Sequence, residues 1–307
     1  MSEAPLLPLL APRHWPTWIG VGLLRATSAL LPVGVQLGLG AWLGRLVMPL
    51  ARRRREIARI NLDLCFPALS ASERQKLLRR HFESLGTGVF EFCLGWWARD
   101  AALRDRVRLE GMEHLSKAFA QGKGVILLSA HFTTLEIGGR FLAMHAAGLR
   151  LNAMYRRSDN PVVERALRAR RRRQFGEPIG RDDVRAMLRA LRKNEAVWYA
   201  FDQNYRRRHA VFAPFFGVPA STNTATSRLA EATGAAVVPF FTYRLPDRSG
   251  YVQRVEPALE GFPSGDHQAD AARLNALIER WVGVAPEQYL WSHRRFKTRP
   301  AGEARFY

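Results

Sequence analysis

The feature that most constrains the fold is a series of short apolar segments, rich in β-branched and aromatic residues, that alternates with helical sequence. These segments lie at residues 124–130 (GVILLSA), 151–156 (LNAMYR), 196–202 (AVWYAFD) and 235–243 (AAVVPFFTY). Residues 161–175 and 182–193, between them, are expected to be helical. Strands separated by helices predict an α/β fold with a mostly parallel or mixed sheet flanked by helices.

An apolar region from Trp15 to Leu50 precedes this domain, and its residues 26–44 carry no charge. Its length suits a helix that spans a bilayer, which needs about 20 residues. Pro32 within it leaves two other interpretations open, a helix lying in the membrane interface and a buried helix of a soluble protein. We expect an N-terminal membrane anchor at residues 1–55 and a cytoplasmic domain at residues 56–307, because the arginines at 52–55 follow the anchor.

The sequence also predicts how the helices near this anchor pack and begin. The pairs Gly34/Gly38 and Gly40/Gly44 have the small-xxx-small spacing that allows close helix contact. Residues 56–98 are expected to be helical, with an N-cap at Ser70 or Ser72.

The charge balance points to an anionic partner. Lys and Arg number 47 against 27 Asp and Glu, a net charge of +20, which suits nucleic acid, an acidic carrier protein or a phospholipid surface. The two cysteines form no CxxC pair, and there is no metal-ligand spacing, GxSxG elbow or phosphate-binding glycine loop. We therefore expect no metal and no cofactor.

Polar residues follow three of the predicted strands. His131 follows the first, Arg156 and Arg157 end the second, and Asp202 ends the third. Because ligands bind beyond the carboxyl ends of strands in open α/β sheets, these side chains are expected to meet at one edge.

The segment HFTTLE places His131 and Glu136 five residues apart across a strand-to-helix turn. A carboxylate bound to one imidazole nitrogen would orient the ring and leave the other nitrogen to accept a proton from an attacking hydroxyl. Donors near the helix start could stabilise the oxyanion formed in acyl transfer. The alternative is structural: residues 133–136 also fit a capping box, in which Glu136 binds only the helix backbone.

HFTTLE resembles the HxxxxD/E motif of lysophospholipid and lipid A acyltransferases. Further segments, in order along the chain, resemble the late lipid A acyltransferase family: WIGVGLL, NLDLCFP (61–67), MYRRSDNP (154–161), VWYAFDQNY (197–205), VFAPFFGVPASTNT (211–224) and PEQYLWSHRRFKTRP (286–300). The resemblance runs from about residue 13 to the C-terminus, and it is strongest to the lauroyltransferases of that family.

This resemblance implies an inner-membrane enzyme that transfers a fatty acyl chain from acyl-acyl carrier protein to a hydroxyacyl chain of Kdo2-lipid IVA. It implies His131 as the base and Glu136 as its partner. Asn204 stands where many relatives have Asp, so Asp202 is the only carboxylate of that triplet.

Several further residues are candidates for substrate binding. Arg156, Arg157, Arg294 and Arg295 suit phosphate or sugar-acid groups. Asp202 could bind a substrate hydroxyl or instead orient a neighbouring group, and Asn223 is expected to shape an acyl or sugar pocket. The basic run at 168–173 is either surface or a dock for an acidic carrier or lipid.

Three other functions remain open. The same fold could act on another anionic acceptor, such as glycerol phosphate or a mannosylated phosphoinositide, with acyl-CoA as donor. The chain could be an inactive membrane scaffold. Nucleic-acid binding is permitted by the charge, but no recognition motif appears and the arginines are scattered among apolar segments; we therefore expect anionic membrane lipid, not nucleic acid, as partner.

Overall fold

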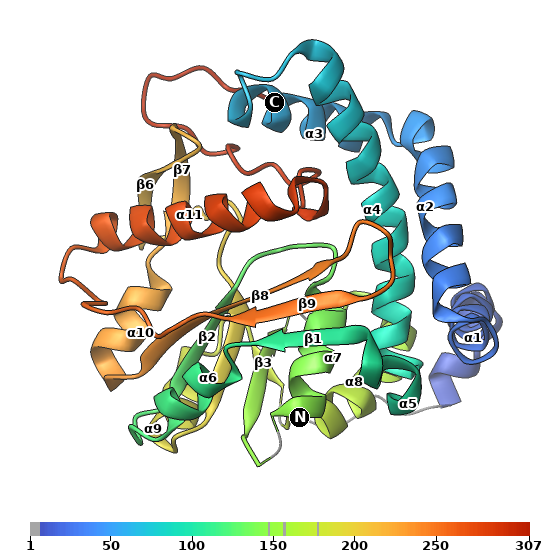
Figure 1. Ribbon diagram of the computed structural model, residues 1–307, viewed down its shortest axis with the longest axis horizontal. Coiled ribbons are helices and arrows are strands. Elements are labelled where there is room, and N and C mark those ends of the chain that lie inside the picture. The colour runs from blue at the N-terminus through green and yellow to red at the C-terminus, as the bar shows by residue number, and fades with distance from the viewer. Residues whose placement is uncertain (1–6, 147, 156–157, 177) are drawn as a thin grey trace.

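The computed structural model describes residues 7–146, 148–155, 158–176 and 178–307. In these residues a seven-stranded sheet has the order β1-β9-β8-β2-β5-β3-β4, and only β8 and β9 pair antiparallel (Figure 1). A separate hairpin is formed by β6 and β7. The strands are β1 Val107–Glu110, β2 Val125–Ser129, β3 Leu151–Tyr155, β4 Ile179–Gly180, β5 Ala196–Ala200, β6 Ala210–Phe215, β7 Val218–Asn223, β8 Ala236–Arg244 and β9 Tyr251–Val255.

Helices cover both faces of the sheet. They are α1 Trp15–Leu30, α2 Val33–Leu50, α3 Arg52–Cys65, α4 Ala71–Trp97, α5 Asp100–Leu103, α6 Met112–Phe119, α7 Leu135–His145, α8 Pro161–Phe175, α9 Val184–Arg192, α10 Ala225–Thr233 and α11 His267–Val284. Buried residues of α3, α9, α10 and α11 pack on one face of the sheet, and those of α6, α7 and α8 pack on the other. The predicted α/β fold with a mostly parallel sheet is confirmed.

The central strands are buried on both faces, which explains their nearly continuous apolar sequence. In β2, Ile126 and Leu128 belong to one core cluster, whereas Val125 and Leu127 belong to the other. The sequence did not reveal the edge strand β1, whose residues are half-buried or exposed.

The apolar N-terminal region forms two helices instead of one continuous helix. Leu31 has extended backbone angles between α1 and α2, as expected for a residue that precedes a proline. Among the described helices, α2 alone is long and apolar enough to cross a membrane, and a third of it is buried within the protein.

The long helix α4 supports both the N-terminal helices and the site. It begins with the predicted N-cap at Ser70, whose hydroxyl accepts from the Glu73 amide while the Glu73 carboxylate accepts from the Ser70 amide. α2 packs along one side of α4 and α7 along another.

Candidate active site

His131 follows β2 and Asp202 follows β5, and the register of these neighbouring strands brings them together. Ser129 pairs with Ala200 at the carboxyl end of the parallel pair, so the residues two positions further along lie at the same level. The His131 amide donates to both carboxylate oxygens of Asp202 at 3.1 Å, and the imidazole Nδ1 lies 2.6 Å from Oδ1. The expected convergence of these two residues at one sheet edge is confirmed.

The environment keeps Asp202 ionised. Burial raises the pKa of this carboxyl group, but the charge and two hydrogen bonds of His131, together with the charge of Arg295, outweigh burial and lower the pKa to about 2. The Asp202 side chain is 2 % exposed and that of His131 is 27 % exposed. An ionised carboxylate accepts from Nδ1–H, which fixes the tautomer with a free lone pair on Nε2.

Three hydrogen bonds hold the turn after His131. The Thr133 amide donates to the Gln288 carbonyl at 2.8 Å, and the Leu290 amide donates to the His131 carbonyl at 2.9 Å. The Thr134 hydroxyl donates to the carbonyl of Thr242 in β8 at 2.6 Å. The backbone that carries the imidazole is therefore fixed by β8 and by the C-terminal segment.

A buried ion pair lies behind this turn. Arg244 of β8 donates to Glu91 of α4 at 2.6 Å and to the Ser84 hydroxyl at 2.9 Å. Ser84 in turn shares a hydrogen bond of 2.8 Å with the hydroxyl of Thr133. The side-chain amide of Gln288 exchanges two hydrogen bonds with the backbone of Arg244. This network joins α4, β8 and the turn after His131.

The expected hydrogen bond between Glu136 and His131 is not formed; within the described residues the carboxylate bound to the ring is that of Asp202. Helix α7 begins at Leu135, which puts Glu136 in its first turn. The capping-box alternative is wrong too, because the N-cap is Thr134 and its side chain makes no capping hydrogen bond. Burial raises the pKa of Glu136, while the charges of Arg171 and His131 act to lower it.

Arg171, which the sequence did not single out, acts on Glu136 through its charge. Its guanidinium lies 5.0 Å from the ring centre of Tyr155 and 5.3 Å from that of Trp96. It belongs to the basic run that was expected either at the surface or at a docking face. Nothing in the sequence distinguished Arg171 from the other four arginines of that run.

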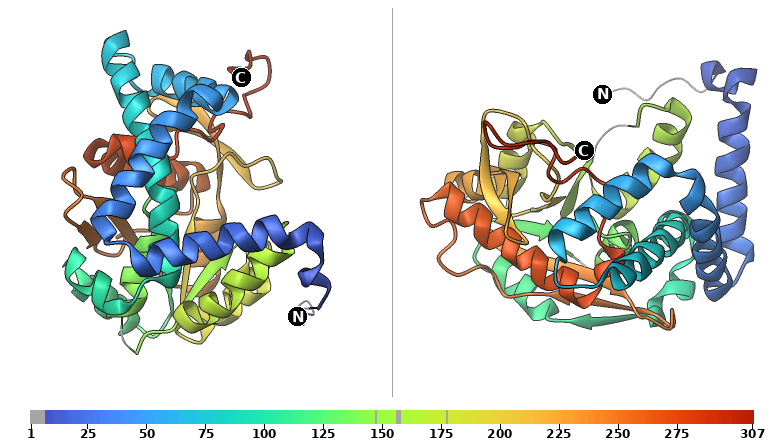
Figure 2. Two further views of the ribbon diagram at one scale, coloured as in Figure 1. Left: turned by 90° about the vertical axis from the view of Figure 1, so that its right-hand side faces the viewer. Right: turned by 90° about the horizontal axis from the view of Figure 1, so that it is seen from above.

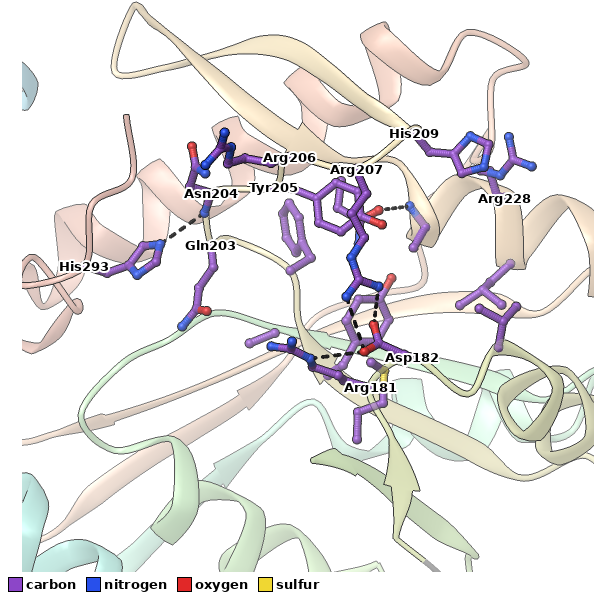
Figure 3. A pocket seen from close by; sticks show the side chains of 18 of the residues that line it. Arg181, Asp182, Gln203, Asn204, Tyr205, Arg206, Arg207, His209, Arg228 and His293 are labelled. Carbon is purple, nitrogen blue, oxygen red and sulfur yellow. Dashed lines mark hydrogen bonds and ion pairs between the residues drawn. The ribbon is translucent and has the colours of Figure 1, made fainter. Parts of the chain in front are cut away.

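A cavity of about 900 Å³ is lined by Phe201 and Gln203, the sequence neighbours of Asp202, whereas His131 and Asp202 are not among the described residues that line it. Figure 3 shows this cavity, with Gln203 labelled. Its apolar wall includes Ile57, Met187 and Leu229. Among the described lining residues there are eight Arg and Lys side chains and one carboxylate: Arg53, Arg54, Arg181, Arg206, Arg207, Arg228, Arg294, Lys297 and Asp182. The cavity therefore combines an apolar interior surface with a strong positive charge.

Asp182 and His293, which both line the cavity, are held by interactions with neighbouring residues. Asp182 accepts from Arg207 at 2.6 Å and lies 3.5 Å from Arg181, as the dashed lines in Figure 3 show. Nε2 of His293 accepts from the backbone amide of Asn204 at 3.1 Å. Burial lowers the pKa of His293 to about 4, so its ring is neutral at neutral pH.

The predicted substrate-binding residues separate into two groups. Arg294 and Asn223 line the cavity. Asp202 and Arg295 do not: both are 2 % exposed, so the prediction that they contact substrate is wrong. Arg295 instead donates to the Ser221 carbonyl and, through its other nitrogen, to Thr222 and Asn275, which joins β7 to α11.

Arg156 and Arg157 lie outside the described residues. Among the residues that are described, no group of three or more His, Cys, Asp and Glu side chains is arranged to hold a metal ion.

Comparison of the sequence with known proteins identifies its family. The family described as bacterial lipid A biosynthesis acyltransferase matches residues 6–298. The chain belongs to this family.

Curated relatives of this acyltransferase match over nearly their full length. The lipid A biosynthesis lauroyltransferase of Escherichia coli is 41 % identical over 96 % of this chain and 95 % of the relative. The palmitoleoyltransferase of the same organism is also 41 % identical, over 97 % and 96 %. The myristoyltransferase is 29 % identical, over 96 % and 91 %. The recognition of the family from the sequence and its assignment as an acyltransferase are confirmed.

Proposed function

We propose that this lipid A acyltransferase moves a fatty acyl chain from acyl-acyl carrier protein to a hydroxyacyl chain of a Kdo2-lipid IVA-type acceptor. The observation that carries the proposal is the His131–Asp202 pair, because Phe201 and Gln203, on either side of Asp202 in the sequence, line a cavity with cationic lining and apolar walls. The base suits a hydroxyl acceptor, and the lining suits a lipid that bears phosphate and carboxylate groups.

In the proposed reaction, Nε2 of His131 takes the proton of the acceptor hydroxyl as its oxygen attacks the thioester carbonyl. The tetrahedral intermediate then expels the carrier thiolate, and the imidazolium returns the proton to that sulfur. Asp202 holds the ring in the required tautomer and stabilises the imidazolium. No group of the protein becomes acylated, so an ester replaces the thioester and a free thiol leaves.

We propose a second catalytic role for Glu136. The charges of Arg171 and His131 both act on the Glu136 carboxyl group and oppose the rise in its pKa that burial causes. A negative charge at Glu136 would stabilise the imidazolium through space, without a hydrogen bond. Arg171 would limit the rise in the Glu136 pKa that burial causes, which favours the ionised form.

The cavity suggests how the acceptor would bind. Arg294 and the other cations of the lining would bind its phosphate or sugar-acid groups, and Asn223 would contribute to the wall. The apolar surface around Met187 and Leu229 would accommodate acyl chain. We extend the acceptor-binding role to Arg156 and Arg157 on the strength of the sequence alone.

We also propose that the enzyme works at the cytoplasmic side of the inner membrane, where a carrier protein of the cytoplasm could deliver its thioester. The net charge of +20 favours both an acidic carrier and an anionic lipid surface. The E. coli relatives are named for the transfer of lauroyl, palmitoleoyl and myristoyl groups, so the family name does not define the acyl chain.

The deciding experiment incubates the purified enzyme with acyl-acyl carrier proteins and Kdo2-lipid IVA, and identifies the product by mass spectrometry. We expect a mass gain of one acyl chain on the lipid. Glycerol 3-phosphate with acyl-CoA serves as the competing pair. Transfer to glycerol phosphate alone would overturn the proposed acceptor and support the alternative.

A further inference from the structure

Helix α2 is in direct backbone contact with α4. A Cβ atom added at Gly40 would lie 2.6 Å from the Thr87 Cα, and one added at Gly44 would meet the carbonyl of Phe82. The Thr87 hydroxyl also lies 3.3 Å from the Leu37 carbonyl. The backbones of the two helices therefore touch over the turn from Gly40 to Gly44.

This contact conflicts with a helix that crosses a bilayer. α4 lies beside the middle and end of α2, and it carries Arg79, Arg80 and Glu83 at that level. Glu83 forms an ion pair of 2.7 Å with Arg45 of α2 itself. If α2 spanned the membrane, these charges would enter the hydrocarbon core with it, at a cost of several kcal/mol.

The two N-terminal helices lie on one face of the protein. In the left view of Figure 2 they run across the side nearest the viewer, in different directions. Figure 1 shows the same pair at the outer edge, with α1 seen end-on beside α2. Two crossed helices can both contact one flat surface only when each lies in its plane.

Both helices leave apolar side chains exposed on this face. We call them the apolar platform: Trp15, Ile19, Leu23, Val35, Leu39, Trp42, Leu43, Leu46, Val47 and Leu50. Their spacing of three or four residues makes one stripe on each helix. An exposed stripe of this size is a contact surface, because soluble monomers rarely expose contiguous apolar patches larger than a few hundred Å².

The charges around the apolar platform indicate what binds to it. Residues 7–51 contain no Asp or Glu, and the arginines at positions 13, 25, 45, 52 and 53 are exposed along it. A stripe of apolar residues edged only by cations fits an anionic phospholipid leaflet. Two copies of the platform would instead bring these arginines together without counter-charges.

We infer that α1 and α2 lie side-on in one leaflet of an anionic bilayer and that neither helix crosses it. The whole chain then stays on one side of the membrane. Arg53 and Arg54, which line the cavity, directly follow α2 and reach the headgroup level. A lipid acceptor could enter the cavity without leaving its leaflet; this last consequence rests on the proposed function, whereas the topology does not.

Single introduced cysteines test the topology. Both native cysteines, Cys65 and Cys93, are buried, and burial raises the pKa of the Cys93 thiol to about 12 and that of Cys65 further. They react poorly with a maleimide, which needs the thiolate. Gly34→Cys has open space around its Cβ. Glu231→Cys, at an exposed position of α10 on the other side of the molecule from α2 (Figure 1), marks the side of the catalytic domain.

Sealed vesicles are labelled with an impermeant maleimide before and after detergent is added, which shows on which side of the membrane each introduced cysteine lies. We expect Gly34→Cys to react before detergent is added, in the same vesicles in which Glu231→Cys reacts. A spanning α2 would place Gly34 on the opposite side, so that Gly34→Cys would react only after detergent while Glu231→Cys reacts before it, and that result overturns the inference. Activity plays no part in this readout, so failure of the proposed reaction would leave it unaffected.

Vesicle flotation tests whether the apolar platform binds an anionic phospholipid surface. In the double variant Ile19→Glu/Leu46→Glu, we expect the fraction of protein bound to anionic vesicles to fall by ~10-fold or more, because binding scales with buried apolar area. Val284→Glu, an exposed apolar residue on α11, should bind as the wild type does. Acyl transfer to detergent-dispersed acceptor should persist in both. Unchanged vesicle binding, or loss of a dimer with no loss of vesicle binding, would overturn the lipid assignment.

Discussion

Replacement of Asp202 by Asn changes one atom and tests the pair at the centre of the site. Asn can still accept from the His131 amide, which now donates to both carboxylate oxygens. Its NH2 group would face Nδ1 of the imidazole or leave the carbonyl as a weaker acceptor. An NH2 donor selects the tautomer with the proton on Nε2, and that tautomer cannot act as a base toward the hydroxyl.

The pKa of Asp202 sets a lower limit on the effect. It falls from an ordinary 3.8 to about 2 although burial acts in the opposite direction, which corresponds to at least ~2 kcal/mol of stabilisation. Loss of ~2 kcal/mol from a transition state that contains imidazolium lowers the rate by ~30-fold. The same exchange in a Ser-His-Asp triad costs ~10⁴-fold. We therefore expect kcat to fall between ~30-fold and ~10⁴-fold.

The assay follows acyl transfer at saturating donor and acceptor, with thermal unfolding measured on the same samples. Asp247→Asn is the matched control, because hydrogen bonds from Ser249 lower the pKa of Asp247, an exposed residue between β8 and β9 that does not line the cavity. We expect this control to keep its activity. If folded Asp202→Asn kept more than about a third of the wild-type kcat, the assigned role of Asp202 would be refuted.

Three further predictions concern binding, stability and pH. Arg294→Ala should raise KM for the anionic acceptor by ~10-fold with kcat nearly unchanged, since it removes a charge-assisted contact; steady-state kinetics measure this, and an unchanged KM would argue against binding by Arg294. Arg244→Met should lower the free energy of unfolding by about 3–5 kcal/mol by leaving the Glu91 carboxylate buried and unpaired, and Arg244→Met/Glu91→Leu should recover most of it; urea titrations measure both, and additive losses would contradict the reasoning. Burial lowers the pKa of His81 and of His293 to about 4, so the unfolded chain binds protons that the folded chain does not, and stability should fall by up to about 3 kcal/mol per histidine between about pH 6.5 and pH 4. The His81→Gln variant should lose part of this pH dependence, and an identical slope would show that His81 does not cause it.

Local sequence was sufficient for the strands β2, β3, β5 and β8 and for the edge where the site lies. The runs around Leu127 and Val197 are apolar because both faces of the sheet are covered, and His131 and Asp202 stand where those runs stop. The partner of the imidazole was not predictable in this way. Glu136 is close along the chain, but Asp202, 71 residues away, is brought to Nδ1 by the register of β2 and β5.

The sequence also did not show which residues of a polar segment are buried. Arg294 and Arg295 are adjacent and chemically identical, yet one lines the cavity and the other is enclosed between β7 and α11. Only the tertiary path of the C-terminal segment separates them. The glycine spacing was more informative: Gly40 and Gly44 pack closely as predicted, but against α4, whereas Gly34 and Gly38 have open space around them.

The most direct test of the account is the turnover of His131→Ala with acyl-acyl carrier protein and Kdo2-lipid IVA, both saturating, at neutral pH. The ring is 27 % exposed, so its removal should leave the fold intact, which thermal unfolding can verify. Because His131 is proposed to take the hydroxyl proton, kcat should fall by at least ~10²-fold. Turnover close to that of the wild type would contradict the proposed chemistry.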